Sequence, residues 1–301
     1  DKPQSQTYEQ FAATAFVNSP YHHPIIGWMD DLENMTADDA REWYRSYYAP
    51  NNATVVVVGD VDPQEVIREA KKYFGPLKPR DIPKIKPQTE IEQMGPRRVT
   101  VKAPAQLPYF VMGYKVPVVT TAKDEWEPYA LEMLAHVLDG GNSARFTKHL
   151  VRGKQLASSI GAGYEIYSRL ADLFIVSGTP SQGNSVDDLE KAVTEQIERL
   201  KTELVSEEEL ERIKTQIVAS KVYEKDSVFY QAMQMGTLET VGLDWRLMDS
   251  FVERLRAVTP QQIQAVAKKY LVEERLTVAQ LDPQPIENGK PAMQHGGGHA
   301  H

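Results

Sequence analysis

A run of four valines, Val55 to Val58, constrains the fold of this chain more than any other feature. Valine is β-branched and favours strands, and turn-forming Gly59 and Asp60 follow the run. A strand that is apolar on both faces belongs inside a sheet, with cover on each face. The segment Thr54–Asp60 therefore predicts a buried strand that needs further strands beside it.

Helices are expected on either side of this strand. The first covers Thr36–Tyr48, with Thr36 as its N-cap and acidic residues in its first turn. The second covers Asp62–Lys72, with a proline at its start. A charged passage with five prolines follows over Pro76–Pro96 and contains few large apolar residues. It is the best linker candidate in the chain.

Strands and amphipathic helices follow the linker. Strands are expected at 98–103, 108–118, 155–167, 171–179 and 276–281. Helices are expected at 126–138, 188–204 and 259–270, with a further helix that Ser206 caps. Gly140-Gly141 indicates a helix stop rather than a phosphate loop, because no Gly-Lys-Ser/Thr follows.

Two stretches of the chain resemble each other. The offset is 223 residues, from Thr36 to Thr259, and it continues into the strands, where Thr54-Val55 falls on Thr277-Val278. The matched residues are Leu32, Met35, Thr36, Ala40, Trp43 and Tyr47 in the first copy, and Leu255, Val258, Thr259, Ile263, Val266 and Tyr270 in the second. Chance is the alternative, because a Thr-capped helix before a strand is common.

A true repeat predicts the domain organisation. Residues 1–75 would be the C-terminal part of a first, incomplete domain, and residues 76–97 a Pro-rich linker. Residues 98–285 would form a complete second domain, and residues 286–301 a flexible His/Gly tail. A half domain exposes apolar surface, which a missing segment or a partner chain must cover. The chain begins at Asp1 without a signal peptide, so we expect either a removed start or a fragment.

Composition excludes several classes of function. The 301 residues contain 34 Lys plus Arg and 42 Asp plus Glu, a net charge of −8, which disfavours nucleic acid and anionic lipid as partners. No apolar stretch is long enough to predict a membrane span. The absence of cysteine excludes disulfides, thiolate nucleophiles and Cys-ligated zinc, and it leaves the compartment open.

Seven histidines are the remaining candidates for a metal site: His22, His23, His136, His149, His295, His299 and His301. His22 and His23 are adjacent and precede a proline, which favours packed or solvated rings in a turn over two ligands of one metal. His136 has Glu132 four residues before it, which favours a side-chain contact. The three tail histidines could bind a transition metal, but the glycines between them make ordering costly.

Three stretches carry a resemblance to a known family. They are Tyr21–Trp28, Tyr47–Ala53 with the valine strand and Asp60-Val61 after it, and Leu138–Phe146. Together they resemble zinc peptidases of the pitrilysin (insulinase) family, in particular its shorter, mitochondrial-processing-peptidase-like bacterial members. The Tyr-Ala-Pro-Asn-Asn stretch before the valines is the most specific part. The resemblance implies repeated pitrilysin-like α+β domains, each a mainly antiparallel sheet covered by helices.

The resemblance also implies a mechanism that needs residues this chain lacks. In the family, zinc lies on an inverted His-x-x-Glu-His motif in the first domain, with a distant glutamate as a further ligand. None of the seven histidines here begins that motif. We therefore predict no catalytic, cofactor-binding or metal-binding residue in this chain, and we expect zinc only in the full-length protein.

A second functional element of the family is an Arg and Tyr pair in the pattern Leu-Arg-Glu-x-x-Gly-Leu-Ala-Tyr. The matching stretch is Leu150–Ser158, where Val151 stands at the Arg position and Ser158 at the Tyr position. Arg152 is one place off, which on an α-helix is a rotation of roughly 100°. The resemblance thus implies a homodimer or heterodimer with a subunit that carries the pair.

These observations lead to one functional hypothesis and one alternative. The chain is expected to be part of a zinc-dependent metalloendopeptidase that encloses its peptide between two half-shells, and to be inactive alone. An unfolded segment would bind as an added strand at a sheet edge. The alternative is a non-catalytic structural or peptide-holding subunit of the same family.

Overall fold

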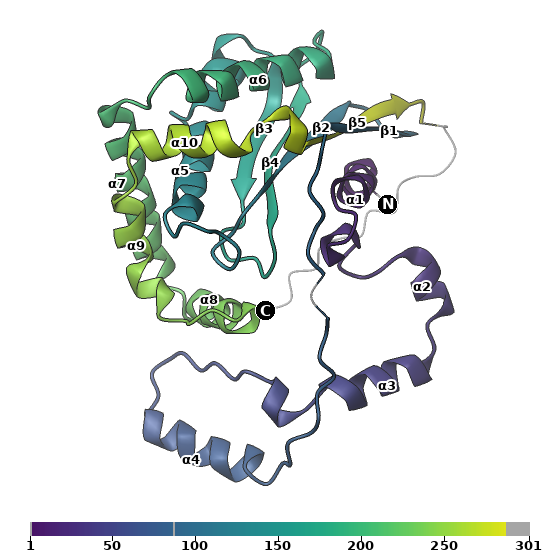
Figure 1. Ribbon diagram of the computed structural model, residues 1–301, viewed down its shortest axis with the longest axis vertical. Coiled ribbons are helices and arrows are strands. Elements are labelled where there is room, and N and C mark those ends of the chain that lie inside the picture. Colours follow the sequence, from purple (N-terminus) through teal and green to yellow (C-terminus); the bar gives the residue numbers. More distant parts are fainter. Residues whose placement is uncertain (1, 87, 287–301) are drawn as a thin grey trace.

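The computed structural model describes residues 2–86 and 88–286 and separates into two regions (Figure 1). Residues 97–284 and the N-terminal helix α1 form what we call the body. Residues 29–86 form a long excursion below it, which we call the arm. None of the helices in these described ranges is long and apolar enough to cross a membrane.

The body is built on one five-stranded sheet. Its strands are β1 (Arg97–Pro104), β2 (Tyr109–Val116), β3 (Ala157–Tyr164), β4 (Asp172–Pro180) and β5 (Leu276–Gln284). Their order across the sheet is β1-β5-β2-β4-β3. The β1–β5 pair is parallel and the other pairs are antiparallel, so Met112 in β2 faces both Val278 and Val176. The predicted α+β class with a mainly antiparallel sheet is confirmed.

Helices account for most of the remaining body. They are α1 (Pro3–Ala15), α5 (Glu127–Asp139), α6 (Val186–Thr202), α7 (Glu207–Glu224), α8 (Val228–Val241), α9 (Leu247–Arg256) and α10 (Pro260–Tyr270). A π-helical turn covers Thr147–Gly153, and short 3-10 turns cover Pro20–His22, Pro50–Asn52 and Glu273–Arg275. The arm contains α2 (Met29–Asn34), α3 (Ala37–Tyr47) and α4 (Pro63–Phe74).

Strand β2 explains how the sheet is covered. Successive side chains of a strand point to opposite faces. Phe110 and Met112 point into the main core with residues of α5, α6 and α10, whereas Val111 points into a smaller core with Phe11 of α1. Both faces of β2 are therefore buried, which accounts for its nearly continuous apolar sequence.

The close approach of α1 depends on a glycine in the sheet. A Cβ on Gly113 would lie 2.7 Å from Cζ of Phe11 and 3.3 Å from Cδ1 of Leu173. Real Cβ atoms essentially never come this close to another heavy atom, so a larger residue here would force the buried Phe11 ring of α1 to shift. Gly113 thus permits α1 to cover the face that α5, α6 and α10 leave open (Figure 1).

The arm contains its predicted helices but not its predicted strand. The side-chain oxygen of Thr36 accepts from the backbone N–H of Asp39, as the N-cap prediction requires. Residues 53–58 belong to no strand, and Val55 and Val57 are 64% and 50% exposed. The prediction of a buried strand over Thr54–Asp60 is therefore wrong for this chain, because no strand among the described residues pairs with it.

Candidate functional site

Three histidines of the described chain, His22, His23 and His136, make local contacts. Nδ1 of His22 lies 2.6 Å from the backbone oxygen of Ser19, and the His22 and His23 rings meet edge to face at 3.8 Å. Nε2 of His136 lies 3.4 Å from Oε1 of Glu132, the side-chain contact that their spacing predicts. The tail histidines His295, His299 and His301 lie outside the described residues.

These groups do not fit a zinc ion. Within residues 2–86 and 88–286, no group of three or more His, Asp or Glu side chains comes together in a way that could hold a metal. Zinc sites need three or four such ligands in tetrahedral geometry. We therefore derive no chemical step through zinc from the residues of this chain.

The stretch that matches the family's Arg and Tyr pattern is occupied differently here. Val151 is half-buried against the main core, and Arg152 reaches Oδ1 of Asn142 at 3.4 Å. The hydroxyl of Ser158 donates to the backbone oxygen of Thr179 at 3.1 Å. Residues 147–153 form a π-helical turn, so the α-helical rotation assumed for Arg152 does not apply.

The backbone of this stretch nevertheless has a special conformation at the position where the pattern has glycine. Gln155 stands there and has a φ of 52°. Among the described residues it is the one non-glycine residue with positive φ. This left-handed conformation costs an L-residue roughly 1–2 kcal/mol. The turn into β3 thus keeps a conformation that suits glycine even though glycine is absent.

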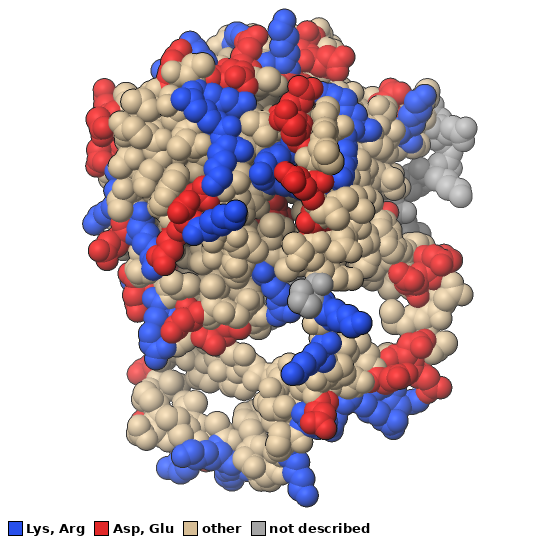
Figure 2. Space-filling model, viewed as in Figure 1, with Lys and Arg blue, Asp and Glu red and all other residues tan. Residues whose placement is uncertain are grey.

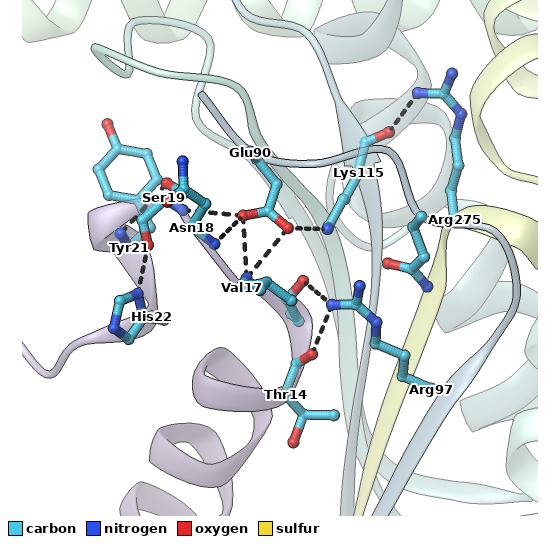
Figure 3. Close-up of polar contacts among 12 residues, drawn as sticks. Thr14, Val17, Asn18, Ser19, Tyr21, His22, Glu90, Arg97, Lys115 and Arg275 are labelled. Atoms are coloured by element: carbon cyan, nitrogen blue, oxygen red, sulfur yellow. Dashed lines mark hydrogen bonds and ion pairs between the residues drawn. The ribbon is translucent and has the colours of Figure 1, made fainter. Parts of the chain in front are cut away.

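A buried ion pair fastens the start of the chain to the sheet (Figure 3). Glu90 accepts hydrogen bonds from the backbone N–H groups of Val17, Asn18 and Ser19 at 2.9–3.1 Å. The Lys115 ammonium donates to the same carboxylate, and the two side chains are 11% and 8% exposed for Lys115 and Glu90. We call Glu90, Lys115 and residues 17–19 the latch.

Electrostatics of the latch favour the charged carboxylate. Burial alone would raise the pKa of Glu90, but the hydrogen bonds from Lys115 and from the three backbone N–H groups outweigh it and lower the pKa to about 2. Burial also lowers the pKa of Lys115, although its pairing with Glu90 opposes that change. The latch therefore holds a charged pair inside the protein at neutral pH.

A second contact beside the latch orients α1. Nη1 of Arg97 donates to the backbone oxygens of Thr14 and Ala15, both at 2.9 Å, at the C-terminus of the helix (Figure 3). A cation there satisfies carbonyls that the helix itself cannot pair. Together with the latch, Arg97 fixes where α1 ends and where the chain turns towards the arm.

Sequence reasoning missed the latch. One signal was available: Lys115 interrupts a strand that is apolar on both faces, and a lysine buried there requires an anionic partner. The partner could not be identified, because Glu90 lies within the charged linker among other acidic residues. The arrangement can hold two parts of the chain together, and it has no group placed to attack or protonate a substrate.

The arm presents a different kind of surface. Its exposed large apolar residues are Met29, Met35, Trp43, Tyr44, Tyr48, Val55, Val57, Val61, Ile67, Tyr73, Phe74, Leu77 and Ile85. Helices α3 and α4 contain no buried residue at all. Figure 2 shows openings between the arm and the body, bordered by uncharged residues and by several Lys and Arg side chains. Exposed apolar surface of this extent is typical of a region that a partner covers.

Comparison with known proteins agrees with this architecture. Residues 34–217 match the model of the peptidase M16 inactive domain. A curated relative, the zinc protease PqqE of Helicobacter pylori, is 36% identical over 205 residues, which cover 67% of this chain and 45% of that protein. The chain therefore spans about half the length of that relative.

Solved structures have the same fold. A protease from Helicobacter pylori superposes with a TM-score of 0.86 at 28% identity, over 94% of this chain and 68% of that one. A peptidase M16 inactive domain from Pseudomonas fluorescens has a TM-score of 0.80 at 18% identity, over 95% and 68%. The family prediction is confirmed: this chain belongs to the peptidase M16 family and carries its inactive domain.

Proposed function

We propose that this chain forms the non-zinc part of a zinc-dependent metalloendopeptidase and hydrolyses no peptide by itself. Membership of the M16 family supports peptide hydrolysis as the reaction of the whole protein. The observation that carries the proposal is the arm, whose capped helices α3 and α4 bury none of their apolar residues. Residues 1–75, apart from helix α1, which packs on the sheet of the body, would complete a zinc-bearing domain, residues 76–97 would link it, and residues 98–285 would be the non-zinc domain.

The opening part of that zinc-bearing domain would come from further polypeptide. It would supply strands that pair with residues 53–58 and would cover the arm. Zinc would be held there and would activate the water that attacks the peptide bond. This chain's own contribution would be to shape and close the peptide-binding chamber.

The peptide would be an unfolded segment bound along a sheet edge. Strand β3 ends the sheet on one side, and such an edge can accept an added strand. One of its N–H groups, on Ala162, is already paired with Oδ2 of Asp139 at 3.2 Å. A bound peptide would therefore compete with Asp139 for that donor.

A dimer with a second M16 subunit that carries the Arg and Tyr groups would provide them, whereas a second copy of this chain would not. Val151 and Ser158 stand at those positions here, and both side chains are engaged locally. Such a partner would grip the substrate and stabilise the oxyanion that forms during hydrolysis.

The test combines zinc analysis with peptide cleavage. The 301-residue chain alone should contain no stoichiometric zinc and should leave an unstructured peptide intact. A longer chain that includes the M16 zinc-binding segment should bind one zinc and cleave the peptide when mixed with an Arg/Tyr-bearing subunit. A matched His22→Ala variant of the longer chain should behave like wild type.

Two results would contradict the proposal. The first is stoichiometric zinc and peptide cleavage by the 301-residue chain alone. The second is a longer chain that forms a stable complex with its partner yet binds no zinc. That second result would favour the alternative, a structural or peptide-holding subunit.

A further inference from the structure

The two edges of the sheet in the body differ in composition. Strand β1 forms one edge and strand β3 the other. Natural proteins protect such edges with charged side chains and prolines, because unpaired backbone groups there can take up a further strand. Strand β1 carries Arg97, Arg98, Lys102 and Pro104, whereas β3 has no charged residue and no proline. The sequence of β3 therefore does little to prevent another strand from pairing with it.

A side chain from outside the strand occupies the middle of the β3 edge. Asp139 is the last residue of α5, and its Oδ2 accepts the backbone N–H of Ala162 at 3.2 Å. Hydrogen-bonded and non-hydrogen-bonded residues alternate along an antiparallel pair, here β3 with β4. The N–H groups of Ile160 and Tyr164, two residues to either side, therefore point to the same open side as that of Ala162. Asp139 thus engages the central one of three donors along this edge.

The surroundings leave room for this contact. A Cβ on Gly161 would lie 3.1 Å from the same Oδ2 of Asp139, which is closer than an ordinary van der Waals contact. Helix α5 ends at Asp139, and Gly141 after it has a φ of 111°. The register shift in β3 lies between Ala157 and Ser159, at the start of the strand. The carboxylate is therefore held beside the regular part of β3, where a further strand would pair.

We propose that Asp139 is an autoinhibitory contact, which an extended peptide must displace in order to pair with β3. In the exchange, a carbonyl oxygen of the peptide accepts the Ala162 N–H, and the carboxylate returns to water. A carboxylate accepts a stronger hydrogen bond than a carbonyl does. A peptide therefore displaces Asp139 only when it gains further hydrogen bonds along the strand.

An extended peptide fits this edge better than a second copy of the chain does. Two copies that paired through β3 would form a symmetric contact, so one Asp139 would have to leave each edge. A peptide displaces a single carboxylate and brings none of its own. This inference rests on the proposed function, because it takes an extended peptide as the ligand of the β3 edge.

The test measures binding of an uncharged peptide to the 301-residue chain and its variants. N-acetyl-Thr-Thr-Val-Thr-Thr-amide is titrated into labelled protein and followed by NMR at the Ala162 amide. It should bind Asp139→Ala about tenfold more tightly than wild type, because no carboxylate has to be displaced. Without peptide, the Ala162 amide should exchange its hydrogen faster in Asp139→Ala than in wild type.

Asp139→Asn is the matched control, since it removes the charge and keeps a carbonyl acceptor on a side chain of the same shape. It should bind the peptide less tightly than Asp139→Ala does. A control peptide with proline at its second and fourth positions lacks two N–H groups and cannot pair as a strand. It should bind Asp139→Ala and wild type equally.

The proposal is overturned if Asp139→Ala binds the first peptide no more tightly than wild type, or if Asp139→Asn binds it as tightly as Asp139→Ala. An equal gain for the proline peptide would also overturn it. A dimer of Asp139→Ala in sedimentation that the peptide does not dissociate would overturn it by assigning the edge to a second copy. None of these outcomes involves zinc or cleavage, so failure here is distinct from failure of the proposed function.

Discussion

Helices α10 in the body and α3 in the arm start from the same local signals and end in different environments. Thr259 and Thr36 each form a capping box, with Gln262 and Asp39 respectively, and the two threonines are matched positions of the repeat. Helix α10 buries five residues, whereas α3 buries none. Capping and helix propensity are therefore enough to define where both helices form. Whether a helix buries its apolar residues depends instead on the elements that lie beside it.

The strands that follow these helices behave differently. Thr277 and Val278 lie in β5 with β1 on one side and β2 on the other, and Val278 is 1% exposed. Their matched positions, Thr54 and Val55, pair with no strand in the described chain. A strand obtains its hydrogen bonds from neighbours, so the same sequence type forms a strand in the body and none in the arm.

The largest predicted effect on the free energy of unfolding is the difference between the same substitution made at each of the two matched valines. Val278→Asp should lower the free energy of unfolding by about 4 kcal/mol or more, because it buries an unpaired charge in the main core. Val55→Asp should change it by less than about 0.5 kcal/mol, because the side chain already faces solvent. Urea unfolding followed by circular dichroism measures both.

The same two variants test whether the arm is in fact less packed than the body. If Val55→Asp destabilises the isolated chain as much as Val278→Asp does, the arm is packed and the two regions do not differ. In a longer M16 chain that carries the proposed zinc-binding segment, Val55→Asp should become as damaging as Val278→Asp. That change would sharpen the comparison, because the only difference would be the strands beside Val55.

The latch should give the next largest effect. Glu90→Ala leaves the Lys115 ammonium and three backbone N–H groups without their acceptor, and should cost about 3 kcal/mol of folding stability. Glu92→Ala is the matched control, since Glu92 is an exposed carboxylate two residues along the same linker. Equal stability of the two variants in urea would show that the latch does not hold α1 to the body.

Lowering the pH should remove from the wild-type protein the folding stability that Glu90 contributes. The pKa of Glu90 is about 2 in the folded protein and near the ordinary value of 4.5 when unfolded. The unfolded chain therefore binds the proton first, so the stability from this group is present above pH 4.5 and is lost as pH falls towards 2. The advantage of wild type over Glu90→Ala should shrink by about 2 kcal/mol between pH 7 and pH 3.

These contrasts explain what the sequence could predict. The apolar run of β2, the alternation in β4 and the cap of Ser206 are local patterns, so the corresponding elements form close to where they were expected. Helix α1 was missed because its burial depends on Gly113, a distant residue in the sheet. The latch joins Glu90 of the linker to Lys115 of β2, so it does not follow from spacing within one element.

The smallest predicted effect concerns the two capping threonines. Thr259→Ala and Thr36→Ala each remove a side-chain acceptor for a backbone N–H at a helix start, which costs about 1 kcal/mol. In α10 this loss should lower the global free energy of unfolding, because the helix is part of the main core. In α3 it should appear as faster amide hydrogen exchange over residues 37–47, with the urea midpoint of the body unchanged. If Thr36→Ala shifts the urea midpoint by as much as Thr259→Ala, the arm unfolds together with the body, and local signals alone do not maintain α3.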